Sequence, residues 1–348
     1  MADRAPKRDL TTVALALVLV AVLVGGGWWL IHELQSPGQT GAASPSESAA
    51  PAPAGDEGAQ LKSIQTVLDS ARSYLKNMKP GSAETILVAA VAKWPTDQQL
   101  RFLYGETLLT LNKNAEAYEQ YSKGITLGPE HPEYRHAAGT IAAGLGKLDD
   151  AESHFLVAQK LDPSSAKYPV FLGQVQRKLG KNDAARASFL TAAHLDPELA
   201  IAWGSLAGLS LDENHPSMAR QHIARARKIE PTRIDWILIE AKALRRDNEP
   251  SKAADLLYAI PERERASNAD LLSELALSLG LMGRVSDAAS MYVEAARLKP
   301  DDPELNYQAA LWLDRDNQRE RARSYADEAA RLGHDGAKTL VEAWKSES

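Results

Sequence analysis

Cysteine is absent from the sequence of 348 residues. Its absence excludes disulfide bonds, thiolate zinc sites, a cysteine nucleophile and a lipid-modified cysteine anchor. An excess of positive charge is also lacking, because the formal net charge is −6 and the basic residues are scattered rather than gathered in one block. Such a chain has no general electrostatic attraction for nucleic acid, so we expect no nucleic-acid partner.

Catalytic motifs are missing as well. The pairs Gly146-Lys147 and Gly180-Lys181 resemble the end of a phosphate-binding loop, but Ile141 and Val175 stand where that loop needs a glycine. The eight histidines show no metalloprotease pairing, and no serine lies in a nucleophile-elbow context. We therefore predict no catalytic residue, no metal site, no cofactor and no enzymatic activity. A catalytic subunit with an unrecognised active site is the alternative, and it would turn over substrate without a partner.

Charge is absent from residues 10–31, a stretch of 22 residues. An α-helix of about 20 apolar residues crosses the hydrocarbon core of a bilayer. Arg4, Lys7 and Arg8 precede the stretch, and no lysine or arginine follows it before Lys62. This asymmetry predicts a cytoplasmic tail at residues 1–9, a transmembrane helix at residues 10–31, and the rest of the chain on the opposite side of the membrane.

A cleaved signal peptide is the alternative for this segment, because both begin with positive charge and an apolar run. A signal peptide usually has a shorter apolar core, followed closely by a cleavage site of small residues. Trp28 and Trp29 occupy that position here. They favour a retained helix, since indole rings prefer the headgroup layer of the membrane.

Residues 32–60 consist mostly of alanine, proline, serine and glycine. A segment of this composition cannot bury a hydrophobic core, so we predict a flexible linker. As a random coil its central part would reach about 25–30 Å.

Prolines then recur with a fixed period of 34 residues, and one more follows at two periods plus one residue. The series consists of Pro95, Pro129, Pro163, Pro197, Pro231 and Pro300. A fixed period of this length indicates stacked structural repeats. We number the positions within a repeat as places, and the eight repeats start at Ile64, Gln98, Pro132, Ala166, Ala200, Ile234, Ala269 and Pro303.

Two places within the repeat are always occupied by small residues. Place 8 reads Ala71, Gly105, Gly139, Gly173, Ala207, Ala241, Ala276 and Ala310. Place 20 reads Ala83, Ala117, Ala151, Ala185, Ala219, Ala253, Ala288 and Ala322. Two antiparallel helices can approach closely only where their side chains are small, so we predict that these places form the contact within each hairpin. Place 24 is bulky in seven repeats and predicts the next layer of the core.

At these residues the sequence resembles the tetratricopeptide repeat (TPR) family over residues 61–336. The resemblance implies an all-α fold, a right-handed superhelical solenoid of about eight helical hairpins, preceded here by the transmembrane helix and the linker. The sixth repeat departs from the pattern, because Arg265 stands at its proline place and one extra residue follows. We expect a local irregularity there.

The last segment, residues 337–348, carries Ala337, Leu340, Val341 and Trp344 at helical spacing. This single apolar stripe predicts a C-terminal capping helix that covers the core of the last repeat.

In the TPR family, ligands usually lie in a concave groove lined by places 2, 5, 6, 9, 12 and 13 of the first helix. From this resemblance we predict a partner-binding groove at Lys167, Phe171, Gln174, Arg177, Lys178, Lys242, Arg245 and Arg246. The basic residues, next to exposed Phe171, Leu238 and Ile239, would suit an extended segment with carboxylates and an apolar anchor. The fifth repeat, with Gly204 and Gly208, would leave a shallow floor between them. The alternative is that the basic residues are ordinary solvated helix ends.

The sequence thus favours a membrane-tethered scaffold that binds a protein or peptide segment. We expect it in the inner membrane of a bacterium, with the N-terminus in the cytoplasm and the TPR domain in the periplasm, in assembly, biogenesis or export at the cell envelope. An organelle-surface receptor with a cytosolic TPR domain is the alternative. The lysine and asparagine that grip chaperone tails in one TPR variant are absent, since Leu68 and Arg72 stand at those places of the first repeat. The sequence indicates neither a particular partner nor an oligomeric state.

Overall fold

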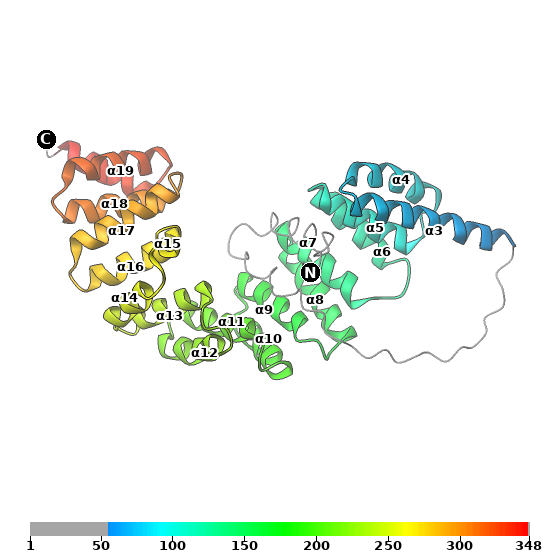
Figure 1. Cartoon of the computed structure of the whole chain (residues 1–348), viewed down its shortest axis with the longest axis horizontal. Coiled ribbons are helices and arrows are strands. Elements are labelled where there is room, and N and C mark those ends of the chain that lie inside the picture. The colour runs from blue at the N-terminus through cyan, green and yellow to red at the C-terminus, as the bar shows by residue number, and fades with distance from the viewer. Residues whose placement is uncertain (1–54, 347–348) are drawn as a thin grey trace, which may run out of the picture. The chain divides into compact units, whose positions relative to one another are not determined.

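The structure is a computed structural model that describes residues 55–346, which form 18 helices and no strand (Figure 1). The first nine are α3 (Gly55–Lys76), α4 (Pro80–Lys93), α5 (Gln98–Thr110), α6 (Asn114–Ile125), α7 (Pro132–Gly144), α8 (Leu148–Leu161), α9 (Lys167–Lys178), α10 (Asn182–Leu195) and α11 (Ala200–Asp212). The others are α12 (Pro216–Ile229), α13 (Ile234–Arg246), α14 (Pro250–Tyr258), α15 (Glu262–Arg265), α16 (Ala269–Leu281), α17 (Val285–Leu298), α18 (Pro303–Arg315), α19 (Arg319–Arg331) and α20 (Asp335–Ser346). The all-α repeat fold predicted from the sequence is confirmed.

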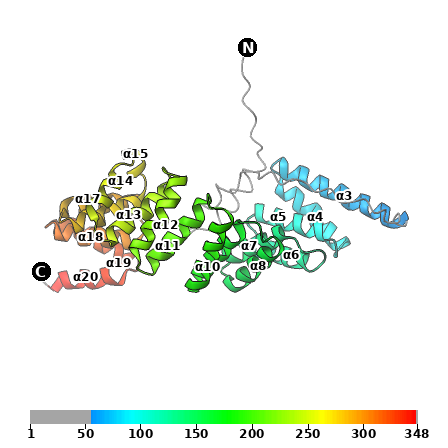
Figure 2. The same ribbon diagram turned by 90° about the horizontal axis from the view of Figure 1, so that it is seen from below.

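The described helices belong to two compact units, which divide after Lys181. In unit 1, the hairpins α3/α4, α5/α6 and α7/α8 pack one against the next, and α9 packs on α7 and α8. In unit 2, α10 packs on α11, and the hairpins α11/α12, α13/α14, α16/α17 and α18/α19 follow, with α20 packed on α19. Within each unit the helices follow one another in chain order (Figure 2).

The interior of the hairpins lies where the small residues predict it. Every alanine at place 20 has an exposed fraction of 0%. The bulky residues at place 24 are buried as well, and Phe155 and Phe189 are among the largest side chains with almost no exposed surface. The stacking of the helices therefore depends on this buried ladder more than on helix propensity.

The glycines at place 8 refine the predicted contact. A Cβ added to Gly105 would lie 2.7 Å from the ring of Tyr121, and a Cβ added to Gly139 would lie 2.8 Å from the ring of Phe155. Both rings stand at place 24 of the same hairpin. A glycine at place 8 thus makes room for an aromatic ring on the second helix.

Each turn between the two helices of a hairpin passes through a residue with left-handed backbone at place 15. Asn112 has a φ of 59° and Gly146 has a φ of 76°, and these two residue types adopt that conformation at little cost. The turn between α3 and α4 uses Met78 instead, with a φ of 56°.

The sixth repeat is irregular, as predicted. Its second helix, α14, has only 9 residues, and a separate helix of 4 residues, α15, follows it. Pro261 lies at the break and disfavours helix in the residue before it, Ile260. The side chain of Ile260 is only 4% exposed, so it continues the core where the helix has ended.

The predicted capping helix is present as α20. Trp344 is 4% exposed and belongs to the core of unit 2, and Leu340 and Val341 pack against that core. The guanidinium of Arg319 lies over the Trp344 ring at 4.8 Å. The helix begins at Asp335, two residues before the segment expected from the sequence.

The transmembrane prediction for residues 10–31 lies outside the described residues, as does most of the predicted linker. Helix α3 begins at Gly55, so the last residues assigned to the linker are helical. From residue 55 to residue 346, no helix has both the length and the apolar character needed to cross a membrane.

Candidate functional site

The candidate residues of unit 1 lie on α9, which packs on the first helix of the preceding repeat, α7. At place 2 of each helix, the Lys167 ammonium donates to both carboxylate oxygens of Glu133, at 2.7 and 2.8 Å. The Tyr168 hydroxyl donates to the same carboxylate at 3.2 Å. Burial raises the pKa of Glu133, but the hydrogen bond and charge of Lys167, together with His136 and the hydrogen bond from Tyr168, outweigh it, so the pKa lies below its usual value. Lys167 is therefore engaged in joining two repeats.

Phe171 is not exposed, contrary to the sequence-based expectation. Only 9% of its surface is accessible, because its ring stacks on Phe155 at 5.5 Å and meets the His136 ring edge-on at 4.5 Å. Phe155 comes from the second helix of the preceding hairpin, so the ring of Phe171 fills the seam between two repeats. It cannot serve as a free apolar anchor for a ligand.

His136 is held as a neutral imidazole in this aromatic cluster. Burial, helped by the charge of Lys167 and opposed by Glu133, lowers the pKa of His136 from 6.5 to about 4. Its Nε2 atom has no hydrogen-bond partner among the described residues. Protonation would place a charge between aromatic rings, which is unfavourable.

This pKa predicts a loss of stability in mild acid. The unfolded chain binds a proton at His136 between pH 6.5 and about 4 while the folded chain does not, so the stabilisation is complete above pH 6.5 and is lost as the pH falls toward 4. Between pH 7 and pH 5 we expect the free energy of unfolding to fall by about 2 kcal/mol.

Urea unfolding of a variant tests this prediction. His136→Phe should remove the loss of stability between pH 7 and pH 5. His215→Gln is the control, since the His215 side chain is 58% exposed, and it should leave the pH dependence unchanged. An unchanged slope in His136→Phe would contradict the prediction.

The remaining candidates of unit 1 lie in the second half of α9. Gln174 is half-buried, Arg177 is half-buried and Lys178 is exposed. Arg177 and Lys178 occupy the last turn, where positive charge is favoured by the helix dipole.

In unit 2 the candidate residue Arg245 forms a buried ion pair. The Arg245 guanidinium binds the Glu274 carboxylate through two hydrogen bonds, one of them 3.2 Å between Nη2 and Oε2. Glu274 is only 2% exposed. The pair links place 12 of α13 to place 6 of α16. Arg245 therefore stabilises the contact between two repeats and is not free to bind a ligand. Glu274 is not among the residues predicted from the sequence, although its opposite charge in the next repeat is a signal that could have found it.

The other two candidates of unit 2 are more available. Lys242 is half-buried and makes no ion pair or hydrogen bond with the described residues. Arg246 is exposed and donates one hydrogen bond to the carbonyl oxygen of Leu211. The candidate residues thus form two sets, one on α9 in unit 1 and one on α13 in unit 2.

The prediction that α11 leaves a shallow, open groove floor is wrong. A Cβ added to Gly204 would lie 2.1 Å from atom Cζ3 of Trp236, so the indole fills the space left by the glycine. Trp236 is fully buried, and its Nε1 donates to Glu230 at 2.6 Å. Glycine here allows the first helices of two repeats to interlock and does not leave an open surface.

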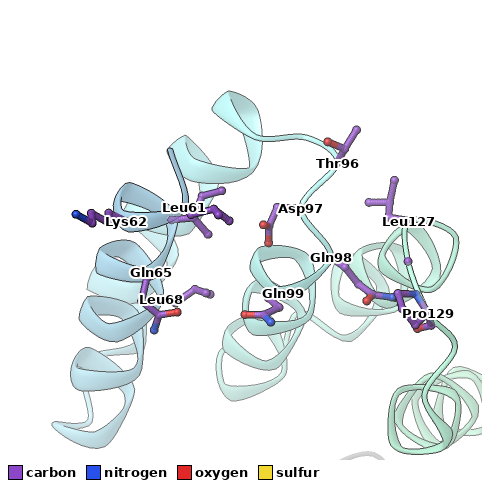
Figure 3. Close-up of a pocket in the computed structure, with 12 residues that line it drawn as sticks. Leu61, Lys62, Gln65, Leu68, Thr96, Asp97, Gln98, Gln99, Leu127 and Pro129 are labelled. Atoms are coloured by element: carbon purple, nitrogen blue, oxygen red, sulfur yellow. Dashed lines mark hydrogen bonds between the residues drawn. The ribbon is translucent and has the colours of Figure 1, made fainter. Parts of the chain in front are cut away.

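A pocket of about 570 Å³ lies in unit 1, where the first two repeats meet. Helix α3 contributes Leu61, Gln65 and Leu68, the N-cap residue of α5 is Asp97, and the first turn of α5 contributes Gln99 (Figure 3). The lining also includes the connection between α6 and α7, so it comes from three separate segments and has no local sequence signal. Its charged, amide and apolar groups can hold a ligand by hydrogen bonds and contact.

Within the described part of the chain, no group of three or more histidine and acidic residues is placed to hold a metal ion. The arrangement on the first helices consists of ion pairs, amides and apolar side chains, which can recognise a partner without changing it covalently. Fold and site together define a class: an array of stacked helical hairpins with a surface suited to binding.

The tetratricopeptide repeat family model matches residues 68–132, 108–166 and 172–234. The matched segments reach into both units, and the helices of these segments show the hairpin pattern described above. The hairpins of these segments are therefore similar to tetratricopeptide repeats. No curated protein matches the chain.

Several solved structures share this fold. A tetratricopeptide repeat protein from Parabacteroides merdae aligns with a TM-score of 0.59 at 14% identity, over 72% of this chain and 99% of that chain. Yeast Tom70 aligns with a TM-score of 0.56 at 21% identity over 78% of this chain, which spans 60% of the Tom70 chain. Pseudomonas aeruginosa pilF aligns with a TM-score of 0.50 at 16% identity, over 61% of this chain and 96% of that chain. Similarity at these identities shows the fold alone, and no enzyme family is indicated.

Proposed function

We propose that this protein is a membrane-tethered scaffold that binds a segment of a partner protein along the first helices of its repeats. The observation that carries the proposal is the stacking of these helices within each unit, with side chains such as Gln174, Lys242 and Arg246 at the groove places. Repeat arrays generally use such extended surfaces for binding. The cations already held in ion pairs, Lys167 and Arg245, stabilise the surface on which the partner would lie.

The uncharged residues 10–31 supply the tether in this proposal. With the N-terminus in the cytoplasm, the repeats would act in the periplasm, at the inner membrane of a bacterial envelope, in assembly, biogenesis or export. A tether raises the local concentration of the binding surface for partners in or near the membrane, which increases apparent affinity without new contacts.

Membrane topology is the first test. In spheroplasts of a bacterial host, added protease should digest the repeats of the full-length chain, and alkaline carbonate should leave the chain in the membrane fraction. A chain without residues 10–31 should be recovered in the soluble fraction. Recovery of the full-length chain as a soluble cytoplasmic protein would contradict the tether. Repeats on the cytosolic face of an organelle would instead support the alternative, an organelle-surface receptor.

Partner binding is tested separately by photo-crosslinking in intact cells. A photoreactive residue at Gln174 or Lys242 should crosslink one discrete protein, because these places face the proposed binding surface. The same residue at Leu156 or Leu190 serves as the control, since these side chains are 49% and 45% exposed on second helices. Equal crosslinking from all four positions, or none from the groove places, would count against a groove-bound partner.

A further inference from the structure

One row of groove residues in unit 2 combines exposed cations with an exposed apolar side chain. Place 13 is occupied by Arg246 at the end of α13, Leu281 at the end of α16 and Arg315 at the end of α18. Residues at the same place of consecutive repeats lie on the same face of the array. Leu281 therefore lies between the two arginines. The corresponding residue of α11 is Asp212, so the cationic part of the row is confined to the last three repeats.

Leu281 is unusually exposed for an apolar side chain of a well-packed array. Its exposed fraction is 63%, and among the large hydrophobic residues of the described chain only Met78 is more exposed. The Trp312 indole packs against Gly280, the residue before Leu281, since a Cβ added to Gly280 would lie 2.1 Å from Cη2 of Trp312. Leu281 and Trp312 thus offer adjoining apolar surface at the groove.

The two arginines have no acidic partner in the described residues. The acids on the same faces of α13, α16 and α18 are paired with other basic residues. These pairs are Asp235 with Arg233, Asp270 with Lys299, Glu274 with Arg245, Glu304 with His334, and Asp314 with Arg319. Arg246 makes one hydrogen bond to a carbonyl oxygen, and Arg315 lies over the Trp312 ring at 4.6 Å. Most of their guanidinium donors remain available.

Helix ends alone do not account for this row. Cations are favoured in the last turn by the helix dipole, which explains the two arginines. The helix dipole does not explain why Leu281, which lies between the two arginines, has 63% of its surface exposed to water. Exposed apolar surface flanked by charge is typical of a binding site.

We propose that this place-13 row docks an extended, acidic segment of a partner protein. An apolar side chain of the segment packs on Leu281 and Trp312, and carboxylates on either side bind Arg246 and Arg315. Packed helices are about 10 Å apart, and an extended chain in the polyproline II conformation advances about 3.1 Å per residue with three residues per turn. Each step between repeats therefore takes about three residues, and side chains three residues apart face the same side. The segment then carries an acid, two residues, an apolar residue, two residues and a second acid. This inference rests on the proposed function and names the partner chemistry for its groove.

The test uses the full-length chain in detergent and a fluorescent peptide of glycine and serine that carries glutamate, leucine and glutamate at this spacing. The peptide should bind, and replacement of both glutamates by glutamine should weaken binding about tenfold, with the difference reduced at high salt. Arg246→Gln, Arg315→Gln and Leu281→Ser should each weaken binding about fivefold. Arg263→Gln and Leu190→Ser are the matched controls, because Arg263 is exposed and Leu190 is 45% exposed, both in unit 2 away from the row. The controls should bind as the native chain does.

Three results would overturn the inference. Equal binding of the glutamate and glutamine peptides would exclude carboxylate recognition. Unchanged binding in all three row variants, each with native circular dichroism, would place the peptide elsewhere. Tighter binding of a single-stranded oligonucleotide than of the peptide would assign the arginines to phosphate. A discrete crosslink at Lys242 or Gln174 alongside any of these results would leave the scaffold function standing, whereas loss of all crosslinks would remove both.

Discussion

Arg245→Met is expected to destabilise unit 2 by about 3–5 kcal/mol, measured as a lower midpoint of urea unfolding. Glu274 is only 2% exposed and loses its hydrogen-bonded partner in this variant. A buried carboxylate without a compensating charge is far less favourable than a paired one. The effect should be accompanied by weaker contact between α13 and α16, because the ion pair is one of the links between these helices.

The double variant Arg245→Met/Glu274→Leu separates the cost of the orphaned charge from the value of the pair. It should regain most of the lost stability, since replacing both partners of a buried pair by apolar residues is often close to neutral. Lys123→Met in unit 1 is the matched control. Its partner is Glu119, and the two side chains are 51% and 58% exposed, so the change should be about 0.5 kcal/mol or less. Similar losses in Arg245→Met and Lys123→Met would show that the burial of Glu274 has no energetic weight.

Gly204→Ala is expected to cost about 2–3 kcal/mol, which is large for one methyl group. The added Cβ would lie 2.1 Å from Cζ3 of Trp236. The indole cannot move aside easily, because it is fully buried and its Nε1 is hydrogen-bonded to Glu230 at 2.6 Å. The two first helices must therefore separate or the indole must leave its position.

Gly81→Ala provides the opposite control, because nothing lies within 4 Å of a Cβ at this helical glycine. It should stabilise unit 1 by about 0.4–1 kcal/mol, because alanine lowers the conformational entropy of the unfolded chain. The combination Gly204→Ala/Trp236→Leu should cost less than the sum of its single changes, since the smaller side chain makes room for the methyl group. Additive effects would show that Gly204 and Trp236 are not coupled.

The fold was predictable because its main constraint acts within one hairpin. The alanines at place 20 recur every repeat and are all buried, and the break in the sixth repeat follows from the extra residue and Pro261. These features depend on periodicity and on the backbone preferences of single residues. Both can be read along the chain without knowing the neighbours of any side chain.

The site was less predictable because it depends on contacts between repeats. Place 6 predicts a groove position for Phe171, yet its ring fills the seam against Phe155 of the preceding hairpin. From the sequence, Gly204 is expected to leave an open surface on α11, whereas Trp236 of the next repeat covers it. The groove places alone do not tell which side chains face a ligand, because a large residue in one repeat changes the exposure of its neighbours.

Met78 has a consequence for how the array opens. It holds the turn between α3 and α4 in a left-handed conformation, with a φ of 56°, where the other hairpins have asparagine or glycine. An ordinary side chain in that conformation costs about 1–2 kcal/mol. The hairpin α3/α4 also contacts a described repeat on one side only, so it has the fewest neighbours to hold it closed. Fraying of the domain should therefore begin at α3 and α4, which would expose the start of α5 and remove one wall of the pocket before any other part of unit 1 loosens.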